Sequence, residues 1–221
     1  MFDPKVMAAA RAAAHAEHGD SVYSMVRLGL AEYQVLSGTD AYRWDADAWY
    51  GGDIHRLVLK TEGEGEVRGP VEDAELQALY ARATGPYFNF QAGVRADFEP
   101  TPSRVYATIG VEGLAPYYIE TLGAVFLSHK GELLARLEAS YDQLITNRLV
   151  IQPRAEMNLA ATDIDARGIG KGVSNIELGL RLRYEIKREF APYIGLSYHR
   201  KTGRTADLAR AAGERVGGTA L

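Results

Sequence analysis

The sequence predicts an all-β protein: an antiparallel, up-and-down transmembrane β-barrel of about twelve strands with a short N-terminal helix. Three observations predict this class. Apolar and polar residues alternate with a period of two over most of the chain after residue 20, as in Phe88–Phe98, and helices do not produce that pattern. The alternating stretches are about 10–12 residues long, which suits a tilted bilayer crossing better than a typical soluble strand. Aromatic residues gather near the ends of these stretches, as at a membrane interface.

The composition is that of a folded chain and excludes several classes of site. Of the 221 residues, 47% are hydrophobic and 24% are charged, and the net charge of −4 gives no support for nucleic-acid binding. Because the chain contains no cysteine, disulfides, thiolate metal sites and cysteine nucleophiles are excluded. No apolar run approaches the roughly 18 residues of a membrane-spanning helix. A β-barrel remains open, because its apolar residues occupy only every second position.

Residues 1–20 are a separate N-terminal segment, which we expect to be helical and periplasmic. Asp3-Pro4 is typical of a helix start, and Val6 to Glu17 is rich in alanine. The segment lacks the basic start and leucine-rich core of a secretory signal, so we expect any export signal to lie upstream. Residues 21–221 are expected to form an outer-membrane barrel, with no second domain.

Eleven strands are expected in the barrel region. Their ranges are 22–35, 41–49, 54–65, 71–83, 87–98, 104–114, 117–127, 132–142, 148–159, 174–187 and 191–201. An open sheet edge is not tolerated in lipid, and bacterial barrels usually have an even number of strands. We therefore expect a twelfth, closing strand to begin at 217–221 and to be incomplete, with the chain cut at both ends.

The connections between the expected strands alternate in kind. Trp49–Gly52, Gly85–Tyr87 and Ala115–Tyr118 are short and aromatic, whereas the intervening connections are polar. Short periplasmic turns alternate with longer outer loops in this way in membrane barrels. The glycine-rich stretch from Asp163 to Gly172 lacks phosphate-loop spacing, and we expect it to be a flexible outer loop.

Sequence parity separates an apolar stripe, expected to face lipid, from a polar stripe, expected to line the lumen. The expected interfacial aromatics are Trp44, Trp49, Tyr50, Tyr87, Phe88, Phe98, Tyr117, Tyr118, Tyr184 and Tyr193. The expected lumen charges are Arg27, Asp45, Asp47, Arg56, Glu62, Arg95, Glu112, Arg136, Glu138, Arg154, Glu156, Arg181, Arg183 and Glu185. Two interpretations of these charges stay open: an ion-pair plug, or a polar path for a small cation or hydrophilic solute.

Several longer motifs, in a fixed order, carry a resemblance to a known family. They are Trp44–Asp53, Ala74–Tyr80, Gln91–Arg95, Gly113–Tyr117, Gln152–Leu159, Leu178–Ile186 and Arg188–Tyr193. Together they resemble the copper resistance protein B family of Gram-negative outer membranes, over about residues 2–210. The resemblance implies an outer-membrane β-barrel in contact with lipid, a role in copper tolerance, and periplasmic copper-binding partners. It also implies a Met- and His-rich N-terminal extension and an aromatic-ended closing strand, neither of which this sequence contains.

The preference of copper for particular donor atoms limits the candidate ligands, because a Met thioether suits Cu(I) and an imidazole suits Cu(I) or Cu(II). Met25 shares the polar parity of the first strand, so it is the candidate ligand inside the lumen; a gap-filling methionine is the alternative. His15 and His18 lie three residues apart and share a helix face, where they either hold copper or are simply solvated. Met157 has the lipid-facing parity and is not expected to bind copper.

Three functions compete at this point. The first is copper resistance or homeostasis, with copper bound by the barrel or passed through its charged lumen. The second is a structural barrel with a plugged lumen that docks a periplasmic copper-binding partner. The third, an outer-membrane hydrolase, needs paired Ser and His side chains that the sequence does not offer, so we expect no enzyme.

Overall fold

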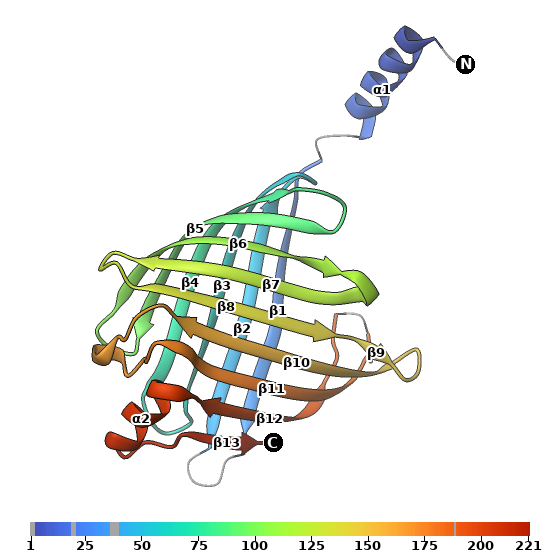
Figure 1. Cartoon of the computed structure of the whole chain (residues 1–221). Coiled ribbons are helices and arrows are strands. Elements are labelled where there is room, and N and C mark those ends of the chain that lie inside the picture. The colour runs from blue at the N-terminus through green and yellow to red at the C-terminus, as the bar shows by residue number, and fades with distance from the viewer. Residues whose placement is uncertain (1–2, 19–20, 36–39, 188) are drawn as a thin grey trace.

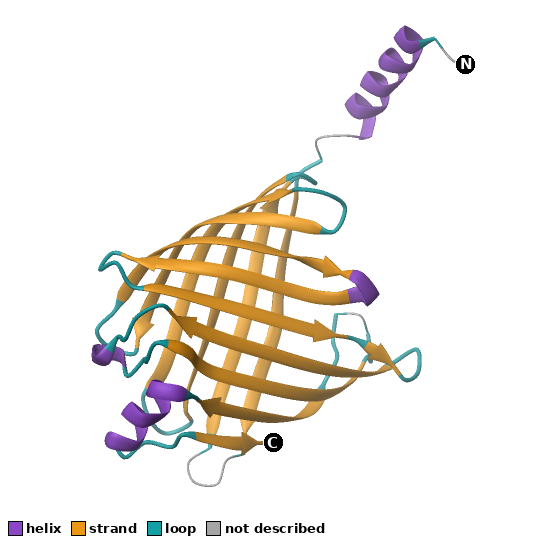
Figure 2. Cartoon of the chain, viewed as in Figure 1, coloured by secondary structure: helices purple, strands orange, loops and turns teal. Residues whose placement is uncertain are grey.

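The computed structural model describes residues 3–18, 21–35, 40–187 and 189–221, and within them most of the chain is strand (Figure 2). In chain order, the elements are α1 (Pro4–His18), β1 (Tyr23–Gln34), β2 (Ala41–Gly51), β3 (His55–Glu66), β4 (Val71–Ala83), β5 (Phe88–Glu99), β6 (Arg104–Ala115), η1 (Pro116–Tyr118), β7 (Ile119–Ser128), β8 (Leu133–Tyr141), β9 (Gln143–Leu144), β10 (Leu149–Ala160), η2 (Asp165–Arg167), β11 (Gly172–Tyr184), β12 (Tyr193–Lys201), α2 (Gly203–Ala211) and β13 (Gly217–Ala220).

The strands of the described chain form one antiparallel barrel in sequence order (Figure 1). Each strand pairs with its neighbour along the path β1 to β8, then β10 to β13, and the two-residue β9 adds to the edge of β10. Two backbone hydrogen bonds between Val35 and Leu221, of 2.9 and 3.4 Å, bring the last strand to the first. The predicted all-β barrel of about twelve strands is confirmed, and it is nearly closed.

The closing strand starts within 217–221, as β13, and pairs with β12 over four positions, as an incomplete strand would. Two other details differ from the prediction. Helix α2 occupies part of the stretch between β12 and β13, where no helix is predicted. The register of β1 against β2 shifts between Leu28 and Leu30, so inward positions change parity within that strand.

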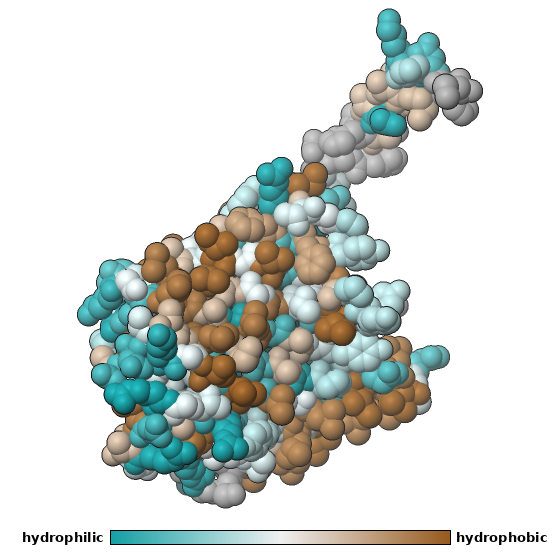
Figure 3. Space-filling view, in the orientation of Figure 1, coloured by the Kyte–Doolittle hydropathy of each residue, from teal (hydrophilic) through white to brown (hydrophobic). Residues whose placement is uncertain are grey.

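The outer wall of the barrel is apolar (Figure 3). Large hydrophobic side chains exposed on it include Val26, Leu28, Leu57, Leu59, Leu76, Val94, Phe98, Val105, Ile109, Val111, Val125, Leu127, Leu137, Leu178, Leu180, Leu182, Ile194 and Leu196. The buried positions are unusually polar and include Glu75, Gln77, Gln91, Arg95, Asp97, Arg104, Thr108, Ser128, Arg136 and Glu156. This inversion of the usual core is what a strand with a lipid face and a polar lumen face produces. No helix among the described residues has the length and apolarity to cross a membrane.

Two of the expected interfacial aromatics face inward instead. Trp49 packs against a small buried cluster of Val58, Leu79 and Ala81, and the Arg56 guanidinium lies 4.5 Å from its ring centroid. Tyr193 lines the interior cavity, and the guanidinium of the cavity-lining Arg181 lies 5.7 Å from its ring centroid. Tyr87 borders the same cavity but is 63% exposed. The prediction that Trp49 and Tyr193 lie in an interfacial girdle is wrong, because strand parity, not nearness to a strand end, decides whether a side chain faces inward or outward. Trp49 shares the inward parity of Asp47, two residues before it.

Candidate functional site

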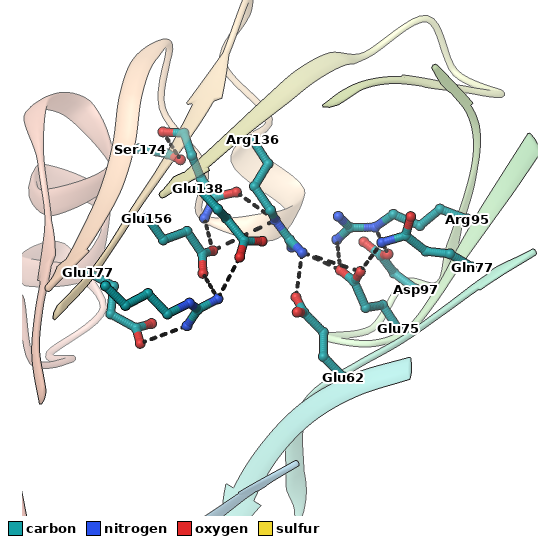
Figure 4. Close-up of polar contacts among 12 residues, drawn as sticks. Glu62, Glu75, Gln77, Arg95, Asp97, Arg136, Glu138, Glu156, Ser174 and Glu177 are labelled. Atoms are coloured by element: carbon teal, nitrogen blue, oxygen red, sulfur yellow. Dashed lines mark hydrogen bonds and ion pairs between the residues drawn. The ribbon is translucent and has the colours of Figure 1, made fainter. Parts of the chain in front are cut away.

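A group of ion pairs crosses the barrel interior, and Arg136 on β8 lies at its centre (Figure 4). Its Nη1 is 2.5 Å from Oε1 of Glu62 on β3, and its Nη2 is 3.0 Å from Oε2 of Glu75 on β4. Its Nε donates a hydrogen bond to Asn158 and lies 3.7 Å from Oε1 of Glu156. Since β3 and β4 lie across the barrel from β8, these contacts span the lumen rather than follow one wall.

The ion pairs continue on the β10–β11 side. Arg154 Nη2 lies 2.9 Å from Glu138 and 2.8 Å from Glu156, and its Nη1 lies 3.5 Å from Glu177. Arg43 on β2 lies 2.6 Å from the same Glu177 oxygen. We call the eight residues Arg43, Glu62, Glu75, Arg136, Glu138, Arg154, Glu156 and Glu177 the central cluster. Buried charges of both signs are stable only when paired in this way.

Further ion pairs connect the central cluster to Arg95 on β5. Its Nη2 is 2.6 Å from Glu75, and its Nε is 2.6 Å from Asp97. The second carboxylate oxygen of Asp97 accepts a hydrogen bond of 2.7 Å from Arg167, which also donates to the Tyr106 hydroxyl at 2.6 Å. Arg167 lies in η2, outside the strands, so a connection between strands reaches into the lumen.

An interior cavity of about 1670 Å³ reaches the central cluster. Its floor includes Glu62, Glu75, Arg136 and Arg154, and its wall continues to Asn89, Glu120 and Arg183, near the end of the barrel where β1 begins. The wall also runs along both β1 and β12, beside the short β13. The lining thus extends from the central cluster to the end of the barrel that carries α1, which we call the N-terminal end (Figure 1), and we call this cavity the cup.

A smaller side cavity of about 200 Å³ lies in the cup wall around Met25. Its lining includes Trp49 and two ion pairs, Arg27 with Asp47 at 2.7 Å and Lys60 with Glu112. Met25 is 41% exposed and lines both cavities, so its thioether is within reach of solutes in the cup.

The structure places the expected lumen charges in three groups. Glu62, Arg95, Arg136, Glu138, Arg154 and Glu156 meet in the central cluster or next to it. Arg27, Asp47, Arg56, Glu112, Arg181, Arg183 and Glu185 line the two cavities, where Arg181 pairs with Glu32 at 3.0 Å and Arg183 with Glu185 at 3.4 Å. Asp45 also lines the cup, but no basic side chain of the described chain lies within ion-pair distance of it.

No pattern in the sequence predicts Arg167 in the lumen. The stretch from Asp163 to Gly172 connects two strands, as a loop does, but it has structure of its own. It contains η2 and an Ile164–Ile169 bridge, and it directs Arg167 onto Asp97. A single arginine in a glycine-rich stretch is a weak indication of a buried residue, because the burial of Arg167 depends on Asp97, which lies far away in the sequence.

The candidate copper ligands are not gathered into one site. Among the described residues, no group of three or more His, Asp or Glu side chains has the geometry to hold a metal ion. Met157 pairs with Leu137 and Ile176, on the side of β10 away from the inward-facing Glu156 and Asn158. The side chains of His15 and His18 lie outside the described residues, although the backbone of both belongs to α1.

An ion pair outside the central cluster joins the β7–β8 connection to β6. Arg104 lies 3.0 Å from Glu132, and the Ser128 hydroxyl accepts a hydrogen bond from the Glu132 backbone nitrogen. Burial is the largest single influence and alone would raise the pKa of Glu132, but the hydrogen bonds from Arg104 and Ser128 and the nearby positive charges together outweigh it and lower this pKa below its usual value. Glu132 therefore stays ionised and holds the connection against the strand.

Comparison with known proteins agrees with these features. The family model described as copper resistance protein B precursor matches residues 22–221. Copper resistance protein B of Escherichia coli is 44% identical over 201 residues, which cover 91% of this chain and 68% of that protein. The copper resistance protein B homolog of Pseudomonas syringae pv. tomato is 41% identical over 202 residues, covering 91% of this chain and 68% of that protein. The chain therefore belongs to the copper resistance protein B family.

Proposed function

We propose that the chain is an outer-membrane barrel of a Gram-negative bacterium that serves copper tolerance by receiving copper ions in its cup, without catalysing a reaction. Membership of the copper resistance protein B family supports the link to copper. The apolar outer wall and the polar interior support a place in a lipid bilayer, because that distribution would be costly for a barrel in water.

The orientation follows from the connections. At the N-terminal end, several strands are joined by three or four residues, as between β2 and β3 and between β6 and β7. The connections from β10 to β11 and from β12 to β13 are longer and lie at the opposite end. Outer-membrane barrels carry short turns on the periplasmic side and longer loops outside. The cup would therefore open toward the periplasm.

The observation that carries this proposal is the shape and charge of the cup. Of the described residues, eleven Asp or Glu and seven Arg or Lys line it, so its wall is net negative and attracts cations. Its floor is the central cluster, where ion pairs occupy the lumen. A cation entering from the periplasm would thus be held rather than pass freely. Met25 supplies the soft ligand that Cu(I) prefers. The carboxylates of the cup are harder ligands, which bind Cu(II) less strongly than imidazole does.

A second function is favoured by the same closed floor. A barrel whose lumen is filled with ion pairs can serve as a docking platform for a periplasmic copper-binding protein at the mouth of the cup. The two functions differ in where copper binds: in the cup for the first, and on the partner for the second.

Copper tolerance in living cells tests the proposal. A Gram-negative strain that lacks its own family member is given the full chain behind a secretory signal, or the same chain carrying Met25→Leu. The wild-type chain should restore growth at raised copper, and Met25→Leu should restore less, at equal amounts of protein in the outer-membrane fraction. Failure of the wild-type chain to reach that fraction, or equal tolerance with an empty vector, would contradict the proposal.

A further inference from the structure

The connection between β10 and β11, residues 161–171, is a folded unit. Ile164 and Ile169 form an isolated bridge through backbone hydrogen bonds of 2.7 and 3.2 Å, and Ile164 is buried. Gly168 turns the chain within this bridge with a φ of 64°, a conformation that favours glycine. Arg167 sits just before this turn, so the fold of the connection fixes the direction of its side chain.

Helix α2 holds the connection in place. The Gly170 backbone nitrogen donates a 2.8 Å hydrogen bond to the hydroxyl of Thr205, which is buried in α2. A Cβ on Gly170 would lie 2.4 Å from Cβ of Arg204, so only glycine permits this approach. Both elements lie at the end of the barrel opposite α1 (Figures 1 and 2). We call residues 161–171 together with α2 the cap.

The cap reaches the central cluster through a chain of shared charges. The side chains of Arg167 and Asp97 are 3% and 2% exposed, and Asp97 binds Arg167 with one oxygen and Arg95 with the other. Arg95 also binds Glu75, and Glu75 binds Arg136. Asp97 and Glu75 thus each pair with two guanidinium groups. Removing one of these cations therefore changes how strongly the carboxylate binds the other.

We propose that Arg167 is a release lever for the closed lumen, through which displacement of the cap loosens the central cluster and admits ions. When Arg167 leaves, Arg95 is the one remaining cation that pairs with Asp97 in the described part of the chain, and Asp97 draws that guanidinium away from Glu75. Glu75 then pairs with Arg136 and no longer with Arg95. The ion pair between Glu75 and Arg136, which crosses the lumen, therefore loses part of its fixed geometry. This inference rests on the proposed membrane barrel and does not depend on copper.

Ion conductance of the full chain in planar lipid bilayers tests this lever, in potassium chloride with a copper chelator present. The variants are Arg167→Met, Arg167→Lys and Asp97→Asn. Arg210→Ala is the matched control, because Arg210 lies in the same cap and, among the described residues, its ion pair is with the exposed Asp207 three residues before it. We expect Arg167→Met and Asp97→Asn each to raise the fraction of time in conducting states by about tenfold or more, as loss of a buried charge-assisted hydrogen bond implies. Arg167→Lys should lie closer to wild type, and Arg210→Ala should match it.

Correct folding of each variant is checked by heat-modifiable migration on gels, and Asp97→Asn removes the same contact from the barrel side if Arg167→Met does not fold. The double variant Arg167→Met/Asp97→Asn should conduct no more than the stronger single variant, because both remove one contact. The lever is refuted if folded Arg167→Met and Asp97→Asn conduct like wild type, or if wild type already conducts freely. Copper binding is measured separately, so failure of the copper function would leave this result unchanged.

Discussion

Replacing Arg136 by methionine probes how much the central cluster contributes to stability. The change keeps most of the side-chain volume but removes the cation shared by Glu62, Glu75 and Glu156. Glu75 keeps Arg95, and Glu156 keeps Arg154, but no other basic side chain of the described chain pairs with Glu62. The side chain of Glu62 is 22% exposed, so its unpaired carboxylate would stay largely shielded from bulk water.

Breaking a buried ion pair from one side costs about 3–5 kcal/mol, and we expect Arg136→Met to lower the free energy of unfolding by about 3 kcal/mol. The double variant Arg136→Met/Glu62→Gln removes the stranded charge, so it should recover at least about 1 kcal/mol of that loss. Arg27→Met is the control: Arg27 pairs with Asp47 at 2.7 Å but is 63% exposed, and such a pair contributes about 0–1 kcal/mol.

Equilibrium urea unfolding of the protein in lipid vesicles, followed by fluorescence of Trp44 and Trp49, measures these differences. The reasoning would be refuted if Arg136→Met cost no more than Arg27→Met. Water would then screen the ion pairs of the central cluster as it screens a surface ion pair, and the central cluster would not close the inner end of the cup.

Three further predictions concern copper, the lipid face and pH. Met25→Ala should reduce copper tolerance of cells more than Met157→Ala, since Met25 lines the cup and Met157 does not; equal effects would remove Met25 as a lumen ligand. Leu178→Arg, on the outer wall, should cost about 2–4 kcal/mol in vesicle unfolding, whereas Gln152→Arg, on the cup wall, should cost clearly less; equal costs would argue against a lipid-facing wall. The lowered pKa of Glu132 means that its ionised form stabilises the fold above its unfolded pKa of about 4.3, and this contribution is lost as pH falls through its folded pKa. Glu132→Gln should therefore flatten the loss of stability on acidification, and an unchanged pH profile would exclude that contribution.

The barrel could be predicted from the sequence because each strand carries its own signal. In β11, Leu178, Leu180 and Leu182 fall on the outer wall while Arg181 and Arg183 line the cup, as the alternation indicated. Closure could be foreseen from the intolerance of lipid for open edges. The bulge in β1 could not, because a register shift depends on how two strands meet and not on the periodicity of one.

The arrangement within the lumen was only partly predictable. That charges of both signs would pair follows from the cost of burying them alone, but parity does not say that Arg136 meets Glu62 across the barrel. Contacts across the lumen depend on how many strands close the barrel and how far they are staggered. Arg167 was missed for the same reason, since its partner Asp97 lies 70 residues away in the sequence.

Copper titration into the purified full chain, under Cu(I) and Cu(II) conditions, tests most directly the claim that the barrel itself receives copper. The wild-type chain is compared with His15→Ala/His18→Ala, which removes the imidazoles of α1, and with Met25→Leu, which removes the thioether in the cup. We predict that copper binding survives loss of both histidines and that Cu(I) binding weakens with Met25→Leu. Binding that disappears with the two histidines and is untouched by Met25→Leu would place copper on the N-terminal helix and contradict a receiving cup.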